Sequence, residues 1–91
     1  MRTIWKFKIQ TIDEQQIAMP FGAQILCVQI QNAEPYIWAL IEDDSNQREE
    51  RWIEVFGTGN PIGNASERKY IGTYQLDNGN LVFHVFEYLG L

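Results

Sequence analysis

Residues 70–86 read YIGTYQLDNGNLVFHVF, and this stretch decides the fold. Two runs rich in β-branched and aromatic residues, 70–76 and 81–86, flank the tetrapeptide Asp77-Asn78-Gly79-Asn80. An Asn-Gly pair between such runs is a strong signal for a tight hairpin, because both residues adopt positive φ easily. The stretch therefore predicts an antiparallel hairpin whose second strand is apolar on both faces.

Strand-like runs continue from this hairpin toward both ends of the chain. Trp5, Phe7 and Ile9 alternate with lysines, as in a strand with one buried face. Residues 25–30 are nearly all apolar, which predicts a central strand covered on both faces. The other candidate strands are 16–19, 36–41 and 52–56. With no helical period in any window, we predict one all-β domain over residues 1–91, a small antiparallel sandwich or barrel of six to seven strands.

Three connecting segments carry weaker signals. Asn32-Ala33-Glu34-Pro35 is typical of a turn. The charged tract 42–50 predicts an exposed connection with one helical turn at residues 46–49. Asn64-Ala65-Ser66 matches a glycosylation sequon, which we interpret as a chance match.

Composition limits the classes of function. A net charge of −5 with only seven basic residues argues against binding along duplex nucleic acid. A single cysteine, Cys27, allows no intramolecular disulfide. No apolar run is long enough to span a bilayer or to form a signal peptide, so we expect a cytoplasmic protein. The short, aromatic-rich chain predicts a homo-oligomer, with Tyr88-Leu89-Gly90-Leu91 as an apolar contact and at least two of the three tryptophans in the core.

The heptapeptide Phe56-Gly57-Thr58-Gly59-Asn60-Pro61-Ile62 is the leading candidate site. Two glycines beside a hydroxyl offer closely spaced backbone N–H groups that can hold a phosphate or a carboxylate. The alternative is a wide connection that needs positive φ at Gly57 and Gly59. The motif is no Walker loop, because no lysine follows in register.

Arg68, Lys69 and Tyr70 follow the loop closely enough to close over it. They could supply the charge and the stacking face for a nucleotide, and the alternative is a solvated basic pair that protects an edge strand. His84 is the lone histidine, and we expect a buried neutral imidazole bonded to a backbone carbonyl.

We expect no metal, no cofactor and no catalytic residues. One histidine and one cysteine cannot form a classical zinc site, and Cys27 itself is expected to be a small core residue. The trio Glu42-Asp43-Asp44 lacks the spaced ligands of a calcium loop and is interpreted as solvated. No nucleophile–base or paired-carboxylate motif is present, so an enzyme is disfavoured.

Three blocks carry a resemblance over nearly the whole chain: Trp38-Ala39-Leu40, the heptapeptide 56–62, and Tyr70-Ile71-Gly72-Thr73 followed by residues 81–87. Together they resemble a family of short uncharacterised β proteins of bacteriophages, prophages and other mobile elements. Members often carry histidine where Asn60 stands, so any role of an imidazole at that position in the family does not carry over to this chain.

The resemblance implies a phage-type accessory protein, and small phage β proteins often act against host defence. Our leading hypothesis is a non-enzymatic sponge for a small anionic nucleotide-type signal. Phosphate would be held by Gly57, Thr58, Gly59 and Asn60, with charge from Arg68 or Lys69 and stacking from Tyr70. The alternative is an inhibitor of a host defence protein that acts through its acidic surface or a strand edge.

Overall fold

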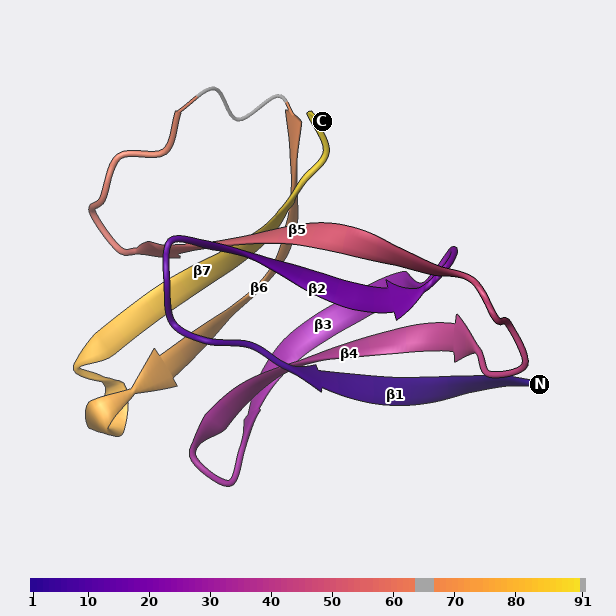
Figure 1. Cartoon of the computed structure of the whole chain (residues 1–91). Helices are drawn as coiled ribbons and strands as arrows, with labels where there is room; N and C mark the ends of the chain where they lie inside the picture. The colour runs from indigo at the N-terminus through magenta and orange to yellow at the C-terminus, as the bar shows by residue number, and fades with distance from the viewer. Residues whose placement is uncertain (64–66, 91) are drawn as a thin grey trace.

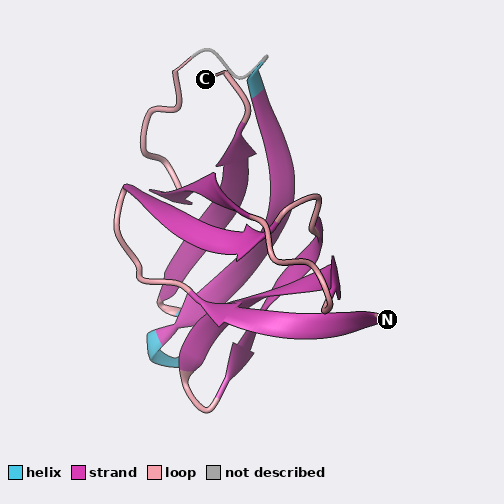
Figure 2. Ribbon diagram, turned by 45° about the vertical axis from the view of Figure 1, so that its right-hand side comes forward, coloured by secondary structure: helices cyan, strands magenta, loops and turns pink. Residues whose placement is uncertain are grey.

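A computed structural model describes residues 1–63 and 67–90 and contains seven β-strands. Strands cover most of the chain, and the helical colour is confined to short turns (Figure 2). The all-β prediction is therefore confirmed. The strands are β1 (Arg2–Lys8), β2 (Glu14–Pro20), β3 (Gln24–Gln31), β4 (Glu34–Glu42), β5 (Arg48–Gly57), β6 (Arg68–Leu76) and β7 (Leu81–Tyr88).

The strands form two antiparallel sheets packed on each other. The first sheet has the order β1-β4-β3, and the second has the order β2-β5-β7-β6 (Figure 1). The edge strands β3 and β6 lie against each other, so the two sheets meet along one side. The tightest point is Gly72 in β6, where an added Cβ would lie 2.8 Å from Cγ1 of Val28 in β3.

Residues with positive φ form the two hairpin turns. Asn32 and Ala33, with φ of 52° and 67°, join β3 to β4. Asp77, Asn78 and Gly79 also have positive φ, and the Asn80 N–H donates to the Asp77 carbonyl at 3.0 Å. The predicted hairpin at residues 77–80 is thereby confirmed. The turn predicted at 32–35 is shorter, because Glu34 and Pro35 already pair in β4.

The interior is apolar and continuous between the sheets. Ile37, Ile53 and Val85 have no exposed surface and come from both sheets. Their neighbours in sequence point away from the core, as the alternation of a strand requires. The other buried apolar residues are Ile9, Met19, Ala23, Val28, Ala39, Ile41, Val55 and Tyr74.

Several sequence predictions about the strands were wrong. The run 25–30 lies in the edge strand β3, and the central strand is β4. Leu26 and Ile30 are therefore 43% and 37% exposed. The predicted helical turn at 46–49 does not form, since residues 48–50 extend β5 and pair with β2.

The residues expected to fill the core also differ. None of the three tryptophans belongs to the buried core, and Trp5 is 39% exposed because β1 is an edge strand. Cys27 is half-buried opposite Trp38 rather than in the core. The sequon 64–66 and Leu91 lie outside the described residues.

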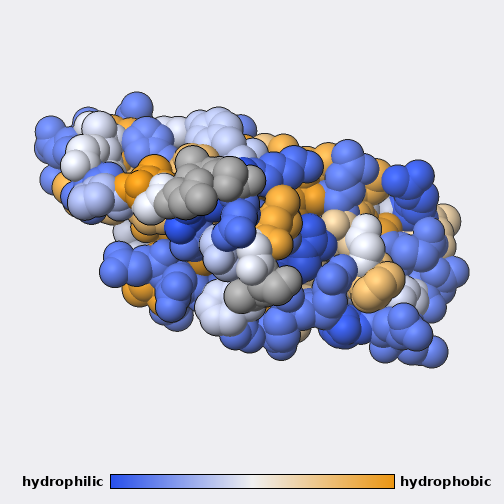
Figure 3. All heavy atoms as spheres, turned by 90° about the horizontal axis from the view of Figure 1, so that it is seen from above, coloured by the Kyte–Doolittle hydropathy of each residue, from blue (hydrophilic) through white to orange (hydrophobic). Residues whose placement is uncertain are grey.

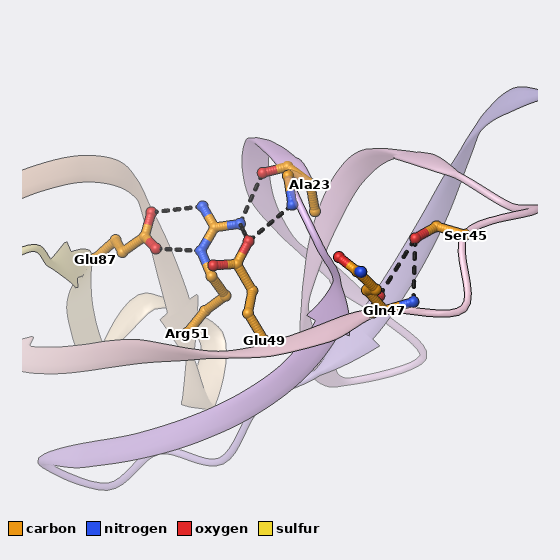
Figure 4. Close-up of polar contacts among 7 residues, drawn as sticks. Ala23, Ser45, Gln47, Glu49, Arg51 and Glu87 are labelled. Carbon is orange, nitrogen blue, oxygen red and sulfur yellow. Dashed lines mark hydrogen bonds and ion pairs between the residues drawn. The ribbon is translucent and has the colours of Figure 1, made fainter.

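An ion pair lies inside the sandwich at one end of the second sheet. Arg51 Nε and Nη2 donate to the Glu87 carboxylate at 2.5 Å and 3.0 Å, and Nη1 donates to the Ala23 carbonyl at 2.7 Å. Figure 4 shows the guanidinium between Glu87 on one side and Glu49 and Ala23 on the other. The hydrogen bond to Glu87 raises the pKa of Arg51, so the guanidinium stays charged. Because Glu87 is only 5% exposed, the loss of Arg51 would leave a buried carboxylate without its hydrogen-bond donors.

Gly72→Ala should destabilise the protein, because the new Cβ would press on the stiff Val28 side chain. We expect a loss of about 1–3 kcal/mol in the free energy of unfolding, measured in urea. Gly63→Ala is the matched control, since nothing lies within 4 Å of a Cβ at that position. Combining Val28→Ala with Gly72→Ala should recover part of the lost unfolding free energy, because the shorter side chain at residue 28 makes room for the new Cβ. Equal stability of Gly72→Ala and wild type would mean that β3 and β6 do not approach this closely.

Glu87→Ala should cost about 1.5–3 kcal/mol of unfolding free energy, because the half-buried Arg51 guanidinium loses its two hydrogen bonds to Glu87 and keeps only Glu49, at 3.7 Å, as a carboxylate partner. Glu34→Ala is the control, since it removes an exposed ion pair with Lys8 at 2.8 Å. Exposed pairs contribute about 0–1 kcal/mol. Similar losses in the two variants would show that Arg51 and Glu87 do not form a buried pair.

Candidate functional site

The second sheet turns one face to the core and the other outward. Buried residues such as Val55 and Val85 pair on the inner side. The residues that alternate with them form what we call the outer face. From β5 these are Trp52, Glu54 and Phe56, from β7 His84, Phe86 and Tyr88, and from β6 Arg68, Tyr70 and Thr73.

A row of hydrogen bonds crosses the outer face from the glycine loop to β6. Thr58 Oγ1 lies 2.7 Å from His84 Nε2, and His84 Nδ1 lies 3.0 Å from Thr73 Oγ1. The Thr73 hydroxyl also bonds the Tyr70 hydroxyl. We call Thr58, His84, Thr73 and Tyr70 the polar row. It joins two of the predicted site residues, Thr58 and Tyr70, through a histidine and a threonine that the sequence analysis did not include in the site.

His84 differs from its prediction. We expected a buried imidazole bonded to a backbone carbonyl, and that prediction was wrong because both ring nitrogens contact threonine hydroxyls. Residue 84 pairs with Phe56 and Thr73, whose side chains point outward. The period-2 pattern around Val85 could have revealed this, since an apolar residue facing the core places its neighbours on the other face.

Aromatic rings lie beside the polar row. Phe86 contacts Phe56 edge-on with ring centres 5.9 Å apart, and it contacts Tyr70 in the same manner at 5.4 Å. Tyr70 is 55% exposed, so its ring is open to a ligand. The hydroxyl bond to Thr73 holds this ring in place.

The glycine loop starts where β5 ends. Gly57 is the last residue of β5 and pairs with Phe83, whereas Gly59 has φ of +89°. The alternative interpretation, a wide connection, required positive φ at both glycines, and positive φ occurs only at Gly59. The Thr58 N–H donates to the Val82 carbonyl at 3.2 Å, and the Asn60 N–H donates to the Gly57 carbonyl at 3.0 Å. These two amides are already used inside the protein, which leaves the Thr58 hydroxyl as the polar group that the loop contributes to the row.

The Arg68 side chain reaches from the start of β6 across the outer face to β5. Its Nε and Nη2 donate to the Glu54 carboxylate at 2.6 Å and 3.3 Å. Its guanidinium carbon is 5.6 Å from the centre of the Phe56 ring and 5.4 Å from that of Tyr88. The hydrogen bond to Glu54 raises the pKa of Arg68. The guanidinium is thus charged, stacked and matched by a carboxylate.

Lys69 points to the other side of β6. It is paired with Glu87, which faces the interior, and it alternates with Arg68 and Tyr70 on the outer face. The structure therefore links Thr58 and Tyr70 through the polar row, places Arg68 on the same face, and turns Lys69 away from it. Ligand contacts of these residues, and of Gly57, Gly59 and Asn60, stay predictions.

Two adjoining hollows border the outer face on the β2 side. The first, of about 340 Å³, is lined by Glu14, Trp52, Glu54, Arg68 and Tyr88. The second, of about 310 Å³, is lined by Asp13, Glu14, Glu54, Val55, Phe56, Asn60 and Pro61. Because they share Glu14 and Glu54, we treat them as one acidic groove. Seen from above, the side that carries β5 and the β5–β6 connection is mostly hydrophilic, with hydrophobic patches between (Figure 3).

The acidic trio Glu42, Asp43 and Asp44 surrounds the N-terminal ammonium, at 2.7, 3.1 and 3.3 Å. Hydrogen bonds, first to Glu42 and then to Asp43, raise the pKa of this amine to about 11. The three carboxylates lie close enough to share an ion. Nothing else in the described residues points to a metal here, and exposed carboxylates alone do not make a site.

The outer face carries hydrogen-bonding and aromatic side chains, and one of its contacts has part of the geometry of a catalytic pair. The Thr58 hydroxyl, hydrogen-bonded to His84 Nε2, resembles a nucleophile beside a base. In serine hydrolases a carboxylate on Nδ1 stabilises the imidazolium that forms, whereas Nδ1 of His84 meets the neutral Thr73 hydroxyl. Hydrogen bonding and stacking are the chemistry that these residues offer.

The comparisons identify a family without a known activity. A family model described as a domain of unknown function, DUF7352, matches residues 1–90. No curated protein and no solved structure matches the chain. Among the described residues, no helix has the length and apolar character needed to cross a membrane.

Proposed function

The chain belongs to the DUF7352 family, and we propose that it is a non-enzymatic binding protein for a small nucleotide-type ligand. The ligand would lie on the outer face, over the polar row. In the phage setting that the sequence resemblance implies, binding would sequester a signalling nucleotide of the host defence.

The polar row beside exposed rings is the observation that carries this proposal. Thr58, His84 and Thr73 present hydroxyl and imidazole groups in a line that ends at Tyr70. Each hydroxyl can donate or accept, as the sugar and base edges of a nucleotide require. Tyr70 and Phe86 offer a stacking surface, and stacking of one base contributes about 1–3 kcal/mol.

The charge on the outer face favours contacts to the base and sugar over a phosphate cradle. Arg68 is already matched by Glu54, and Lys69 lies on the other side of the strand. The amides of Thr58 and Asn60 are bonded within the protein. A phosphate would therefore be held by the Thr58 hydroxyl and by His84, near the open end of the row at Gly59.

A thermal-shift screen against cyclic nucleotides and adenosine-ribose compounds tests the proposal, followed by calorimetry with the compound that binds. Thr58→Ala and His84→Ala should each weaken binding by about 1.5–3 kcal/mol, the range for a hydrogen bond to a charged group. Gly59→Val should abolish binding, because a β-branched residue resists φ of +89°. Ser45→Ala, which removes a hydroxyl from the β4–β5 connection, is the control.

The ligand recovered after heat denaturation separates binding from catalysis. A sponge returns the ligand intact, whereas an enzyme returns an altered compound. Undiminished affinity in Thr58→Ala, His84→Ala and Gly59→Val together would place the ligand elsewhere or show that the loop only connects two strands.

We further propose that the protein self-associates, with apolar residues of the first sheet and the C-terminal segment as contacts. Ile4, opposite Leu40 on the side of that sheet away from the core, is 54% exposed, and Leu89 is 57% exposed. Size-exclusion chromatography with light scattering should give a molar mass above that of the monomer. Ile4→Lys or Leu89→Lys should lower this mass toward the monomer value. A clean monomer at micromolar concentration would contradict this.

A further inference from the structure

We infer that the acidic groove binds an arginine-containing basic segment of another protein. The sequence left open an alternative function, inhibition of a host protein through the acidic surface. The groove names the residues of that surface and the kind of side chain that they would bind. It does not depend on the nucleotide proposal, because it uses residues of β2 and the preceding connection rather than the polar row.

The groove combines carboxylates with aromatic rings. Asp13, Glu14 and Glu54 supply the carboxylates, and Trp52, Phe56 and Tyr88 supply the rings. Cations are attracted to the faces of such rings, most strongly to tryptophan, and arginine uses this contact more often than lysine. Tryptophan, tyrosine and arginine are also the residues that contribute most to binding at protein interfaces.

The charge of the groove is negative after its internal pair is counted. Arg68 balances Glu54, and within residues 1–63 and 67–90 no ion pair balances Asp13 or Glu14. Glu14 stands directly opposite Glu54 in the β2–β5 register. Like charges in such positions destabilise a sheet. Because Arg68 already offsets the charge of Glu54, an incoming cation would pair with Glu14. The net charge of −5 would also speed the approach of a basic partner.

Arg68 shows how this surface holds a guanidinium. It is bidentate on Glu54 and lies 5.6 Å and 5.4 Å from the ring centres of Phe56 and Tyr88. One strand away, Glu14 and Trp52 border the same hollow and offer a second carboxylate and a second ring. An incoming arginine can therefore repeat the arrangement of Arg68 with Glu14 and Trp52.

The size of the groove favours a chain segment over a single small cation. The two hollows, of about 340 and 310 Å³, extend from Trp52 and Tyr88 to Asn60 and Pro61. A second basic side chain of an extended segment could therefore reach Asp13 while the first lies on Trp52.

The test is an NMR titration of the ¹⁵N-labelled protein with the blocked peptide acetyl-Gly-Arg-Gly-Arg-Gly-amide. The control peptide replaces both arginines with citrulline, which keeps the shape and removes the charge. We expect the arginine peptide to shift amide signals of β2, β5 and the start of the glycine loop. The citrulline peptide should bind with an affinity lower by about tenfold or more, since it loses the ionic and cation–π attraction.

Matched variants separate the groove from general acidity. Glu14→Gln should weaken binding of the arginine peptide roughly three- to tenfold, because it removes the carboxylate beside Trp52. Glu34→Gln removes the same charge on the other sheet and should leave the affinity unchanged. His84→Ala should weaken nucleotide binding and leave peptide binding unchanged, so the two proposals can fail separately.

Three results would overturn the inference. One is the absence of shifts at millimolar arginine peptide. Another is equal weakening by Glu14→Gln and Glu34→Gln, which would mean diffuse attraction to an acidic protein. The third is a shift of the groove signals when the protein alone is diluted, which would assign the groove to a second copy of the chain.

Discussion

The buried pair of Arg51 and Glu87 is the interaction on which the rest of the structure depends. It joins β5 to β7 inside the sandwich, and a third hydrogen bond joins both to Ala23 between β2 and β3. Because a strand alternates its faces, turning residues 51 and 87 inward turns Trp52, Phe86 and Tyr88 outward. A shift of register between β5 and β7 would break the two hydrogen bonds from Arg51 to the buried Glu87 carboxylate, which disfavours other registers.

The outer face follows from that register. The polar row needs His84 between Thr58 and Thr73, and the groove needs Trp52 and Tyr88 beside Glu54. Most of these side chains stand on paired strands, and Thr58 follows the end of β5 directly, so the sheet sets much of their geometry. The close approach of β3 to β6 at Gly72 supports the same sheet from its other edge. A rigid support of this kind lowers the entropy lost when a ligand binds.

The sequence predicted the class of fold and the 77–80 hairpin, because alternation and turn chemistry are local properties. It did not predict which strand is central, since the apolar run 25–30 packs against β6 from an edge. Nor did it predict the site fully. Thr58 and Tyr70 were predicted as binding residues of the glycine loop and the segment after it. Their link through His84 and Thr73 depends on pairing between strands that are distant in sequence. Lys69 was grouped with Arg68 by sequence, and the alternation of β6 separates them.

The facing carboxylates of Glu14 and Glu54 have a consequence for the stability of the protein. A sheet optimised for its own stability would place opposite charges, or a charge and a neutral group, at this pair. Arg68, which is bidentate on Glu54, offsets this conflict on the Glu54 side, and Glu14 has no ion pair among the described residues. Local conflicts of this kind are found where a protein has been shaped for an external contact rather than for its folding equilibrium. With a basic segment bound as proposed, the pair would favour recognition at some cost in stability.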